Sequence, residues 1–388
     1  MTASLQATIT AEAILPGATL GVLGGGQLGR MFCMAARSMG YRTVVLDPNQ
    51  ASPAGLIADT HICAAYDDVP ALQQLAAACA AITTEFENVP ASSLQRLEKL
   101  KPVHPAAACV QIAQNRITEK NFARDSGISP APFYEVSTAA DLAAAIAVTG
   151  LPAILKTTTL GYDGKGQHIV HSLPQAQQAF ASMGAVVCVL EKKLSLKLEI
   201  SALLARNARG EIQCYPTAEN EHRQGVLHQT IVPARVSAKL TEQAQAAAIK
   251  LANAMSYVGV LAVEFFITSD DELIFNEMAP RTHNSGHYTQ DATVTSQFEQ
   301  QVRVMCNLSP GDARLTSPVV MVNLLGDLWP PQWAQLLREP NAKLHLYGKD
   351  MARPGRKMGH YNVLASTIDQ AIVVANQIFS ALAARQQE

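Results

Sequence analysis

Short apolar runs alternate with helical stretches through the first hundred residues. The opening unit has a strand pattern at 19–23, a glycine-rich turn, a helical pattern from Arg30 to Met39, and a second strand pattern at 41–47. Three further short strands are predicted at 62–64, 81–84 and about 102–104, separated by helices at 70–80 and 92–100. This alternation predicts a βαβ unit that continues into a mostly parallel sheet.

Beyond residue 113 the pattern shifts toward paired strands. Two pairs of apolar runs flank turn-forming residues and predict hairpins, 199–205 with 211–216 and 261–267 with 272–277. Single strands are predicted at 153–156, 186–191, 319–324 and 343–346. Helices are predicted at 114–126, 141–147, 241–255 and 367–384. This mixed content places the chain in the α/β class.

Composition narrows the class of protein. The chain has 388 residues, 48% hydrophobic and 16% charged, with a net charge of −2, so we expect two or three globular domains. A nucleic-acid partner is not expected without a basic excess, and a membrane span is not expected without an apolar stretch of about 18 residues. The seven cysteines form no C-x-x-C pair, and the first residues lack a secretion-signal pattern. These features predict free thiols and a cytoplasmic location.

The first candidate site is the glycine turn Gly24-x-Gly26-x-x-Gly29 between the first strand and helix. Glycines there allow a tight turn and a close approach of the backbone to an anion at the helix N-terminus. Asp47 follows about 20 residues later, where a dinucleotide-binding fold places a ribose-binding carboxylate. One interpretation is an NAD- or FAD-dependent enzyme. The other is a tight turn from strand to helix with no ligand.

A second candidate site follows the strand that ends at Lys156. The segment Gly161–Gln167 is rich in glycine, which is typical of a mobile loop whose backbone N–H groups close over phosphates. It lacks the G-K-[ST] ending of a Walker A loop, because Gly166 and Gln167 follow Lys165. The alternative is a flexible hairpin tip.

The third candidate is a pair of carboxylates. A hairpin centred between Asp270 and Asp271 places Glu264 opposite Glu277, among apolar neighbours. Like charges in that setting require either a protonated carboxyl or a bound divalent cation, and oxygen ligands favour Mg²⁺, with Mn²⁺ as an alternative. Asn276 adds an amide oxygen if the strand bends there. Two solvated edge glutamates, or a shift of register, are the other interpretations.

Cationic residues gather in two later segments. Arg281, His283 and His287 follow the second strand of that hairpin, where a cation can hold a small anion or stabilise developing charge. The second segment is a loop rich in proline and glycine, which predicts either a phosphate-binding site or a solvated basic turn. Its cations are Lys349, Arg353, Arg356 and Lys357.

Seven blocks of sequence, in order along the chain, resemble the ATP-grasp superfamily and, within it, the N5-carboxyaminoimidazole ribonucleotide synthase family. The blocks are GGGQLGRM (24–31), EFENVP (85–90), NRITEK (115–120), GYDGKGQ (161–167), VEFF (263–266), NEMAPRTHNSGH (276–287) and YGKDMARPGRKMGH (347–360). The resemblance implies an α/β chain with an ATP-grasp fold, an N-terminal Rossmann-like pre-ATP-grasp domain and a small β-rich C-terminal domain. The sequence pattern predicts a flexible extension at 1–17, which is longer than is usual in this family. We expect domains at 18–112, 113–310 and 311–388, with a mobile lid at about 125–195.

The implied reaction is the ATP-dependent carboxylation of 5-aminoimidazole ribonucleotide (AIR) by bicarbonate in de novo purine biosynthesis. ATP phosphorylates bicarbonate to carboxyphosphate, and the exocyclic amine of AIR takes the carboxyl group, with ADP and phosphate as the other products. Such an enzyme positions its reactants, neutralises phosphate charge and excludes water from an unstable mixed anhydride. The resemblance also implies a homodimer and a hand-off of the product to the downstream mutase.

The resemblance assigns roles to particular residues. ATP would be bound by Arg116, Lys156, Gly161, Tyr162, Asp163, Gly164, Lys165, Gly166, Gln167, Glu191, Lys192, Lys193, Leu194, Glu199, His222, Asn276 and Glu277, with 191–194 as the adenine hinge. Magnesium would be bound by Glu264 and Glu277. AIR would be bound by Gln27, Leu28, Glu85, Asn284, Lys349, Arg356 and Lys357, the last three at its 5′-phosphate. The catalytic group would be Tyr162, Asp163, Arg281, His283, Asn284 and Lys349, with Asp163 as proton acceptor. Asp47 would then be structural.

Three other functions are compatible with parts of the sequence. Formate-dependent glycinamide ribonucleotide transformylase uses a similar scaffold, although HNSGH and GYDGKGQ favour the carboxylating enzyme. An NAD(P)-dependent oxidoreductase is supported only by the glycine turn and Asp47, and it leaves the Glu264–Glu277 pair unexplained. A non-catalytic nucleotide sensor is disfavoured because the charged residues of the site are intact. The hinge at 191–194 is more basic than the family pattern, which leaves its adenine contacts open.

Overall fold

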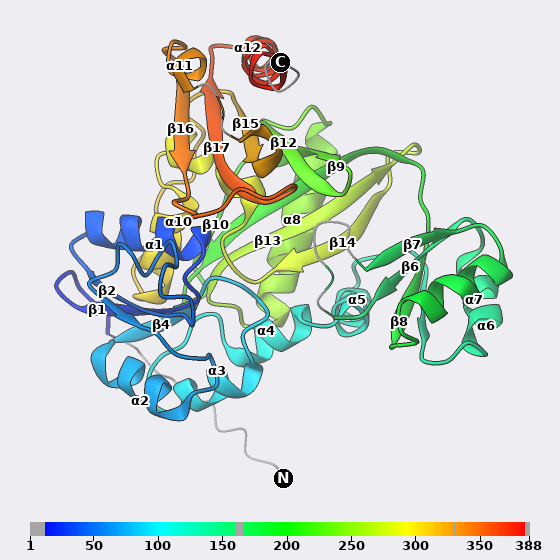
Figure 1. Cartoon of the computed structure of the whole chain (residues 1–388), viewed down its shortest axis with the longest axis horizontal. Coiled ribbons are helices and arrows are strands. Elements are labelled where there is room, and N and C mark those ends of the chain that lie inside the picture. The colour runs from blue at the N-terminus through cyan, green and yellow to red at the C-terminus, as the bar shows by residue number, and fades with distance from the viewer. Residues whose placement is uncertain (1–11, 160, 162–165, 330, 332, 385–388) are drawn as a thin grey trace.

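A computed structural model describes residues 12–159, 161, 166–329, 331 and 333–384. Its strands form a four-stranded sheet near the N-terminus, a second four-stranded sheet, and a nine-stranded sheet that reaches the C-terminal part (Figure 1). The predicted α/β class is confirmed.

The first sheet contains the predicted βαβ unit. Its strand order is β3-β2-β1-β4, and β1 pairs in parallel with both β2 and β4. The strands are β1 (Thr19–Leu23), β2 (Arg42–Leu46), β3 (Thr60–Ile62) and β4 (Ala81–Thr84). The helices are α1 (Gln27–Ser38), α2 (Val69–Ala78), α3 (Ala91–Glu98) and α4 (Ala107–Ala113). Apolar side chains on both faces of the sheet are buried, as a parallel sheet requires.

The second sheet belongs to a small unit at the right of Figure 1, which follows α5 (Arg116–Asp125). Its strand order is β5-β8-β6-β7. Its elements are β5 (Phe133–Val136), α6 (Asp141–Thr149), β6 (Ala153–Thr157), β7 (Gln167–Val170), α7 (Leu173–Ser182) and β8 (Cys188–Lys192). One face packs on α6 and α7 through Leu142, Phe180 and Leu190. This unit occupies the segment in which the lid is predicted.

The nine-stranded sheet forms the rest of the molecule, in the order β14-β13-β9-β11-β12-β15-β17-β16 with β10 beside β9. Its strands are β9 (Leu196–Arg206), β10 (Ile212–Cys214), β11 (Ala218–Arg223), β12 (Val226–Val232), β13 (Gly259–Thr268), β14 (Leu273–Ala279), β15 (Val319–Leu325), β16 (Ala342–Leu346) and β17 (Lys357–Leu364). Because β12 pairs with β15, the sheet runs unbroken across the predicted boundary at 310/311. The β-rich C-terminal part therefore extends the central sheet.

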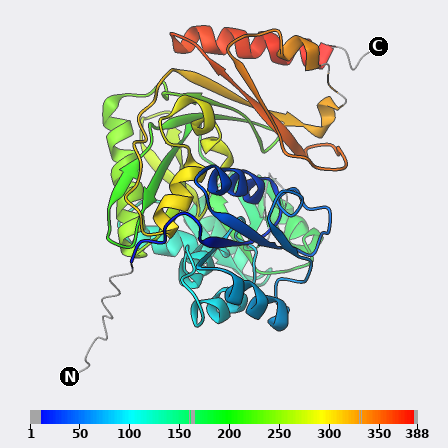
Figure 2. The same ribbon diagram turned by 90° about the vertical axis from the view of Figure 1, so that its left-hand side faces the viewer.

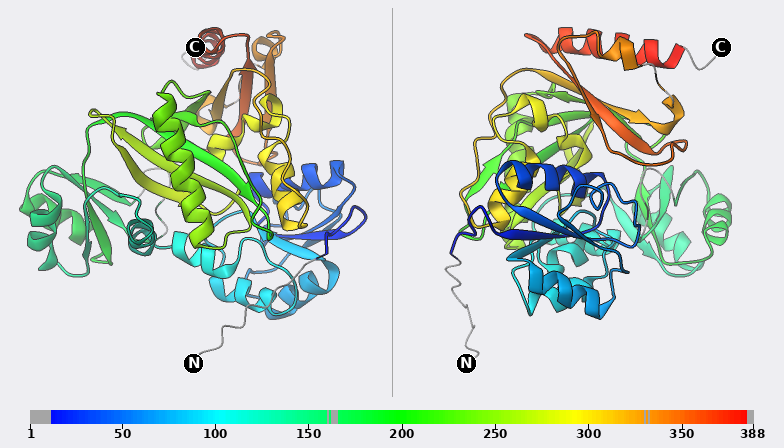
Figure 3. Two further views of the ribbon diagram at one scale, coloured as in Figure 1. Left: turned by 180° about the vertical axis from the view of Figure 1, so that it is seen from behind. Right: turned by 60° about the vertical axis from the view of Figure 1, so that its left-hand side comes forward.

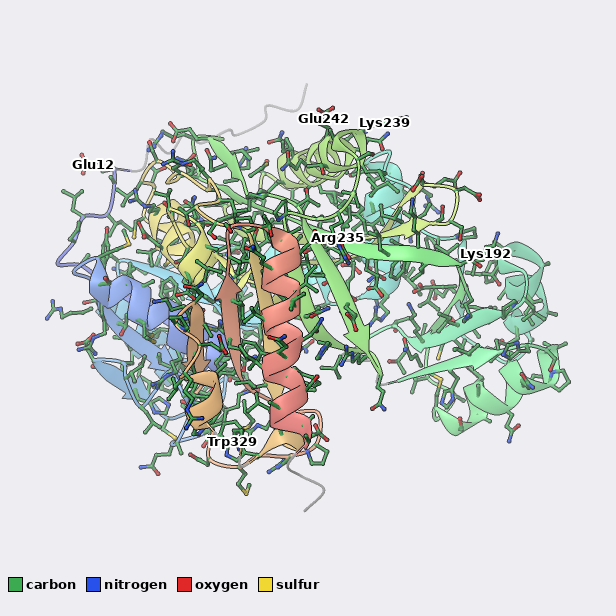
Figure 4. All side chains as sticks on the ribbon, turned by 90° about the horizontal axis from the view of Figure 1, so that it is seen from above. Glu12, Lys192, Arg235, Lys239, Glu242 and Trp329 are labelled. Carbon is green, nitrogen blue, oxygen red and sulfur yellow. The ribbon has the colours of Figure 1, made fainter. Side chains whose placement is uncertain are left out.

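Two long helices cover different parts of this sheet. α8 (Ala238–Ala254) packs against β9, β13 and β14 (Figure 3), and α12 (Ile368–Ala384) packs against β15 and β17 (Figure 4). The Ser237 hydroxyl accepts from the Leu240 N–H, so α8 begins three residues before the predicted start. The remaining helices are η1 (Asn284–Gly286), α9 (Thr289–Ala292), α10 (Gln297–Met305), η2 (Gly326–Leu328) and α11 (Trp333–Leu336).

Several elements escaped prediction from the pattern: β5, β7, β11, β12, β17, α7 and α10. The strand β11 has the polar sequence AENEHR, which β-propensity does not favour. It is a strand because it pairs with both β9 and β12. The interpretation of 349–360 as a loop is wrong at its end, because Lys357 begins β17 and pairs with Leu325 of β15.

The hairpin β13–β14 confirms the predicted cross-strand pair, because Glu264 stands opposite Glu277. The register shifts by one immediately afterwards, where Phe265 pairs with Phe275. Asn276 is therefore the extra residue of a β-bulge, and the bend considered at this position is present.

The composition predicts no membrane span and free thiols. Among the described helices, none is both long and apolar enough to cross a bilayer. All seven cysteines are free.

Candidate active site

A cavity of about 330 Å³ opens between the first sheet, the start of α5 and the β13–β14 hairpin. Its lining residues come from segments far apart in the sequence. They are Gln27, Leu28, Glu85, Phe86, Glu87, Asn88, Ala113, Gln114, Arg116, Glu119, Thr158, Thr159, Gly161, Glu264, Glu277, Met278, Ala279, Arg281, His283, Asn284 and Lys357. Most of them carry polar groups, so the cavity suits a charged ligand.

The carboxylates of Glu264 and Glu277 line one side of this cavity. Glu264 is 8% exposed, and its burial, followed by the charge of Glu277, raises the pKa of its carboxyl. Arg116 donates to Glu277 Oε2 at 3.2 Å and to the carbonyl of Gly161 at 3.1 Å. One arginine therefore joins the start of the glycine loop to the carboxylate pair.

The turn after β14 presents His283 and Asn284 to the cavity. Asn284 is 8% exposed, and neither polar atom of its amide has a hydrogen-bond partner within the described residues. His283 Nδ1 lies 2.9 Å from Ser285 Oγ and accepts from the Ser285 N–H, while its Nε2 lies 3.7 Å from Glu264 Oε1. Burial and the Arg281 cation hold the pKa of His283 well below its usual value. A neutral ring that accepts at Nδ1 carries its proton on Nε2, so His283 presents a donor toward Glu264.

Arg281 and Lys357 supply positive charge to the cavity. Burial alone would raise the pKa of the Glu87 carboxyl, but the Arg281 guanidinium, which donates to it, lowers that pKa. Lys357 lies on the cavity wall, and Lys349 Nζ donates to the Lys357 carbonyl at 2.6 Å. Arg356 instead donates to the carbonyl of Met351 at 2.7 Å.

A buried ion-pair group connects the second sheet to α5. Glu191 Oε2 lies 2.9 Å from Lys156 Nζ, and Glu191 Oε1 lies 3.3 Å from Lys120 Nζ. Burial would raise the pKa of Glu191, but the two lysines lower it. Lys120 also donates to the carbonyl of Asn276, the bulge residue, at 3.3 Å. The group therefore ties the second sheet to the carboxylate hairpin.

Glu199 and His222 form a further pair, from β9 and β11. His222 Nδ1 lies 2.9 Å from Glu199 Oε2. Burial alone would lower the pKa of His222, but the hydrogen bond with Glu199 raises it above its usual value. The two residues meet as the resemblance implies, because β11 lies beside β9 in the sheet.

The glycine turn of the first sheet is filled by the protein's own carboxylates. The Gly25 N–H donates to Asp47 Oδ2 at 2.6 Å, and the N–H groups of Gly26 and Gly29 donate to the two oxygens of Glu85. A Cβ on Gly26 would lie 2.4 Å from Glu85 Oε1, so glycine is needed for this close approach. These contacts agree with a structural role for Asp47.

The carboxylate pair fits a magnesium ion by its chemistry. Glu264 and Glu277 offer oxygen ligands in adjacent positions, and Asn276 lies beside them. Within the described residues, no three or more His, Cys, Asp or Glu side chains converge as a complete metal site. Mg²⁺ is commonly held by one or two carboxylates together with substrate phosphates, so two glutamates suffice for a nucleotide-bound ion.

Family models match three consecutive parts of the chain. They describe a ribonucleotide synthetase preATP-grasp domain at 17–114, an ATP-grasp domain at 121–298 and a phosphoribosylaminoimidazole carboxylase C-terminal domain at 319–373. The N5-carboxyaminoimidazole ribonucleotide synthase of Bacillus subtilis is 44% identical over 363 residues, which span 93% of this chain and 95% of that protein. The chain belongs to the N5-carboxyaminoimidazole ribonucleotide synthase family.

Solved structures agree with this family. An ADP complex of an N5-carboxyaminoimidazole ribonucleotide synthetase matches with a TM-score of 0.92 and 44% identity, over 97% of this chain and 100% of that one. The Aspergillus clavatus N5-carboxyaminoimidazole synthase in complex with ADP and AIR matches with a TM-score of 0.87 and 32% identity, over 94% and 98% of the two chains. The matches favour the synthase over the transformylase and the oxidoreductase.

The site residues implied by the family resemblance divide into three groups. On the cavity wall lie Gln27, Leu28, Glu85, Arg116, Gly161, Glu264, Glu277, Arg281, His283, Asn284 and Lys357. Off that wall lie Lys156, Gly166, Gln167, Glu191, Lys192, Lys193, Leu194, Glu199, His222, Asn276, Lys349 and Arg356. Outside the described residues are Tyr162, Asp163, Gly164 and Lys165.

The segment expected to form the adenine hinge of a synthase is partly engaged within the protein. The Glu191 carboxylate is held by the two lysines described above. The main-chain N–H groups of Lys192 and Lys193 donate to proline carbonyls at 2.9 and 3.1 Å. A purine at this hinge would therefore contact other main-chain groups.

Three charged residues near the site were missed by sequence reasoning: Glu87, Glu119 and Lys120. Glu119 is 3% exposed and accepts from the Met278 N–H at 2.6 Å. Its burial, and then the charge of Glu277, raise its pKa to about 8. In helix α5, Glu119 and Lys120 lie on the same buried side as Ala123. Charged residues on the buried side of a helix indicate that it packs against polar partners, and this pattern could have identified them.

Proposed function

We propose that this chain catalyses the ATP-dependent carboxylation of AIR by bicarbonate, as its family name implies. The observation that carries the proposal is the cavity, where the Glu264–Glu277 pair, Lys357 and the Asn284 amide line one space. Such a space suits a triphosphate at the carboxylate side and a nucleoside monophosphate at the lysine side. The relative from Aspergillus clavatus that binds ADP and AIR supports the same pair of ligands.

ATP is assigned to the side of the cavity next to the second sheet. Arg116, Lys156 and the loop 161–167 bring cations and backbone N–H groups to the phosphates. The main chain of 192–194 lines the adenine. The paired Glu199 and His222, with the Glu199 carboxylate as acceptor, face the ribose hydroxyls.

Magnesium is assigned to Glu264 and Glu277, with Asn276 beside them and Mn²⁺ as an alternative ion. When bound, the ion neutralises phosphate charge during transfer. Because Arg116 already contacts Glu277, the same side chain links this carboxylate to the phosphate-binding loop.

The reaction proceeds by two transfers. A bicarbonate oxygen attacks the γ-phosphorus of ATP, the bond to ADP breaks, and carboxyphosphate forms. The exocyclic amine of AIR then attacks the carboxyl carbon, directly or after its release as carbon dioxide, while phosphate leaves and the amine loses a proton.

We assign the carboxyl-transfer end of the cavity to the turn after β14. Arg281 and the Nε2–H of His283 donate to the developing negative charge, and the Asn284 amide holds the carboxyl group or the amine. Tyr162 and Asp163 belong to the same end by the family resemblance, with Asp163 as proton acceptor. The neutral state of His283 suits a donor rather than an acceptor at Nε2.

AIR is assigned to the space between the glycine turn and β17. Lys349, Arg356 and Lys357 bind the 5′-phosphate, with Lys349 held against the Lys357 carbonyl. Gln27, Leu28 and Glu85 contact the ribose and the base. The Glu85 oxygens already accept from the glycine turn, and each has a second lone pair for a ribose hydroxyl.

The setting of the enzyme is also inferred from the family. We propose a cytoplasmic homodimer that passes its labile carbamate product to the downstream mutase. The seven free thiols support a reducing compartment.

The deciding experiment measures ADP release with Mg²⁺ and ATP. The substrates are AIR with bicarbonate, and glycinamide ribonucleotide with formate as the control pair. We expect release that requires AIR and is lost in Glu277→Gln, with Glu221→Gln on β11, outside the cavity wall, as the matched control. Release only with glycinamide ribonucleotide would move the function to the transformylase, and no stimulation by either pair would refute the substrate.

A further inference from the structure

A group of buried and half-buried polar side chains lies outside the cavity wall and has no part in the proposed chemistry. This histidine cluster consists of His287, Asp291, His345, Tyr347, His360 and Asn362. It connects the turn after η1 and helix α9 with the hairpin β16–β17, whose tip lies above the first domain in Figure 2.

The three imidazole rings of the cluster lie in series. The rings of His345 and His360 are stacked, with centroids 4.6 Å apart and planes 13° apart. His287 continues the series, with its centroid 4.8 Å from that of His360. Burial lowers the pKa of both His287 and His360 well below the usual value, so these two rings are neutral and can pack closely.

Asp291 joins both strands of the hairpin to α9. Its Oδ2 accepts from His345 Nε2 at 2.7 Å and from Asn362 Nδ2 at 2.6 Å. His345 is on β16 and Asn362 is on β17, so one carboxylate fixes both strands. Asn362 Nδ2 also donates to the carbonyl of His287 at 3.3 Å.

The other end of the cluster is tied to the turn that carries Asn284. Gln297 Oε1 accepts from the His283 N–H at 2.8 Å, which fixes the orientation of the amide. Gln297 Nε2 then donates to the His283 carbonyl at 2.8 Å and lies 3.1 Å from His287 Nδ1. The His287 ring and the His283–Asn284 backbone are therefore held by one side chain.

These contacts join two walls of the cavity that are far apart in the sequence. Lys357 stands three residues before His360 on β17, and Asn284 stands three residues before His287. Tyr347 directly follows β16, and its hydroxyl is hydrogen-bonded to His360 Nδ1 at 2.9 Å. The Tyr347 ring also packs with Leu28 of α1, which lines the cavity. The position of the Lys357 strand relative to Asn284 is thus set through the cluster.

We propose that Asp291 is a positioning residue for the nucleotide substrate. By holding His345 and Asn362, it fixes the distance between the cation that binds the 5′-phosphate and the amide that faces the reacting amine. The site then selects a nucleoside monophosphate whose amine lies at that distance. This inference rests on the proposed function, because it takes Lys357 and Asn284 as contacts of the two ends of AIR.

The test compares Asp291→Ala with Asp291→Asn, and uses Asp312→Ala as a control for loss of an exposed acid. Asp312 pairs with Arg314 at the surface, at 3.3 Å, away from the cavity. We expect Asp291→Ala to raise the KM for AIR by about tenfold or more while the KM for ATP stays within about twofold. Asp291→Asn keeps one acceptor oxygen and is expected to give an intermediate KM for AIR.

Two measurements separate positioning from general destabilisation. Calorimetric titration of AIR into the protein without ATP should show the same weakening in Asp291→Ala, at a temperature well below its melting point. An equal rise of both KM values, or unchanged AIR affinity with a lowered Tm, would overturn the proposal. Wild-type protein that binds AIR without turnover would refute the proposed function alone, whereas wild-type protein that does not bind AIR would refute both.

Discussion

Two acidic groups of the molecule differ in what their oxygens contact. In the glycine turn of the first sheet, Asp47 and Glu85 accept from the backbone N–H groups of three glycines. In the hairpin β13–β14, Glu264 and Glu277 stand opposite each other, and both line the cavity. Backbone N–H groups hold the carboxylates of the first group, whereas the carboxylates of the second group stand opposite each other and lie near the side chains of Arg116 and His283.

The difference separates a structural carboxylate from a functional one. A carboxylate that accepts backbone N–H groups stabilises the fold, even inside a motif that resembles a nucleotide-binding turn. Two carboxylates held face to face lower the stability of the fold, and such an arrangement is retained for a ligand that neutralises it. The contacts of Asp47 in the glycine turn therefore fit a structural role, whereas the Glu264–Glu277 pair fits the metal-binding role proposed above.

The largest expected effect is on the functional pair. Glu264→Gln is expected to lower kcat by roughly 10²–10³-fold, because it removes a charge that is needed when phosphate is transferred. The same change should raise the free energy of unfolding without metal by roughly 0.5–1 kcal/mol, since it relieves the repulsion from Glu277. Steady-state kinetics and chemical denaturation measure the two effects, with Glu221→Gln as control. Lower stability together with full activity would reverse the assignment of this pair.

The structural carboxylate should show the opposite behaviour. Asp47 accepts from the Gly25 N–H, the Asn49 N–H and the Tyr66 hydroxyl, at 2.6, 2.8 and 2.6 Å. Asp47→Ala leaves these donors unpaired and is expected to lower the free energy of unfolding by about 3 kcal/mol. The kcat of the folded fraction should stay within about twofold. Asp68→Ala, which removes the cap of α2, is the matched control with an expected loss of about 1 kcal/mol.

Glu119 lies near Glu277 and provides a pH-dependent test of the charge at the carboxylate pair. Burial and Glu277 raise its pKa from 4.5 to about 8, so the folded state binds a proton that the unfolded state releases. Its contribution to stability is full below pH 4.5 and is lost as the pH rises through about 8. We expect the free energy of unfolding of Glu119→Gln to decrease less with pH than that of the wild type. Without metal, the difference should reach roughly 2 kcal/mol at pH 8. Parallel pH profiles of unfolding for the variant and the wild type would contradict the assignment.

The smallest expected effect is that of Glu85→Gln, which tests whether Glu85 has a structural role, a substrate-binding role, or both. Glu85→Gln keeps one acceptor oxygen for the glycine turn and should lower the free energy of unfolding by about 1 kcal/mol. If Glu85 also binds the ribose of AIR, the KM for AIR rises several-fold while the KM for ATP does not change. An unchanged KM for both substrates would make Glu85 purely structural, as Asp47 is.

Much of the fold follows from local pattern. The βαβ unit, the hairpin β13–β14 and the helices α8 and α12 are visible in the sequence because apolar residues repeat at strand or helix spacing. The pairing of Glu264 with Glu277 was predicted from a turn centred between Asp270 and Asp271. Next to the turn, however, Ile267 pairs with Leu273, so the bulge at Asn276 is what brings the two glutamates opposite each other. The strands β11 and β17 could not be predicted this way, because polar residues interrupt their apolar pattern. They are strands because they pair on both sides, β11 with β9 and β12, and β17 with β15 and β16.

The types of residue that line the candidate site could be predicted from the sequence, but the residues that hold them in place could not. Arg281 and His283 stand out because they follow a strand that carries a carboxylate, and the family resemblance adds Asn284. Glu119 and Lys120 do not, since only the packing of α5 against β14 gives them partners. The interactions of Asp291 with His345 and Asn362 are equally hidden, because 54 and 71 residues separate the partners.

The sequence by itself determined the α/β class, the carboxylate hairpin and the family, because these depend on spacing and on residue types within short segments. Only the tertiary structure decided that backbone N–H groups hold the carboxylates of Asp47 and Glu85, whereas Glu264 and Glu277 stand opposite each other at the cavity. It also decided that the C-terminal strands extend the central sheet and that a histidine cluster ties Lys357 to Asn284. The physical reason is that hydrogen-bond partners and burial depend on contacts between distant segments, which the pattern of one segment does not record.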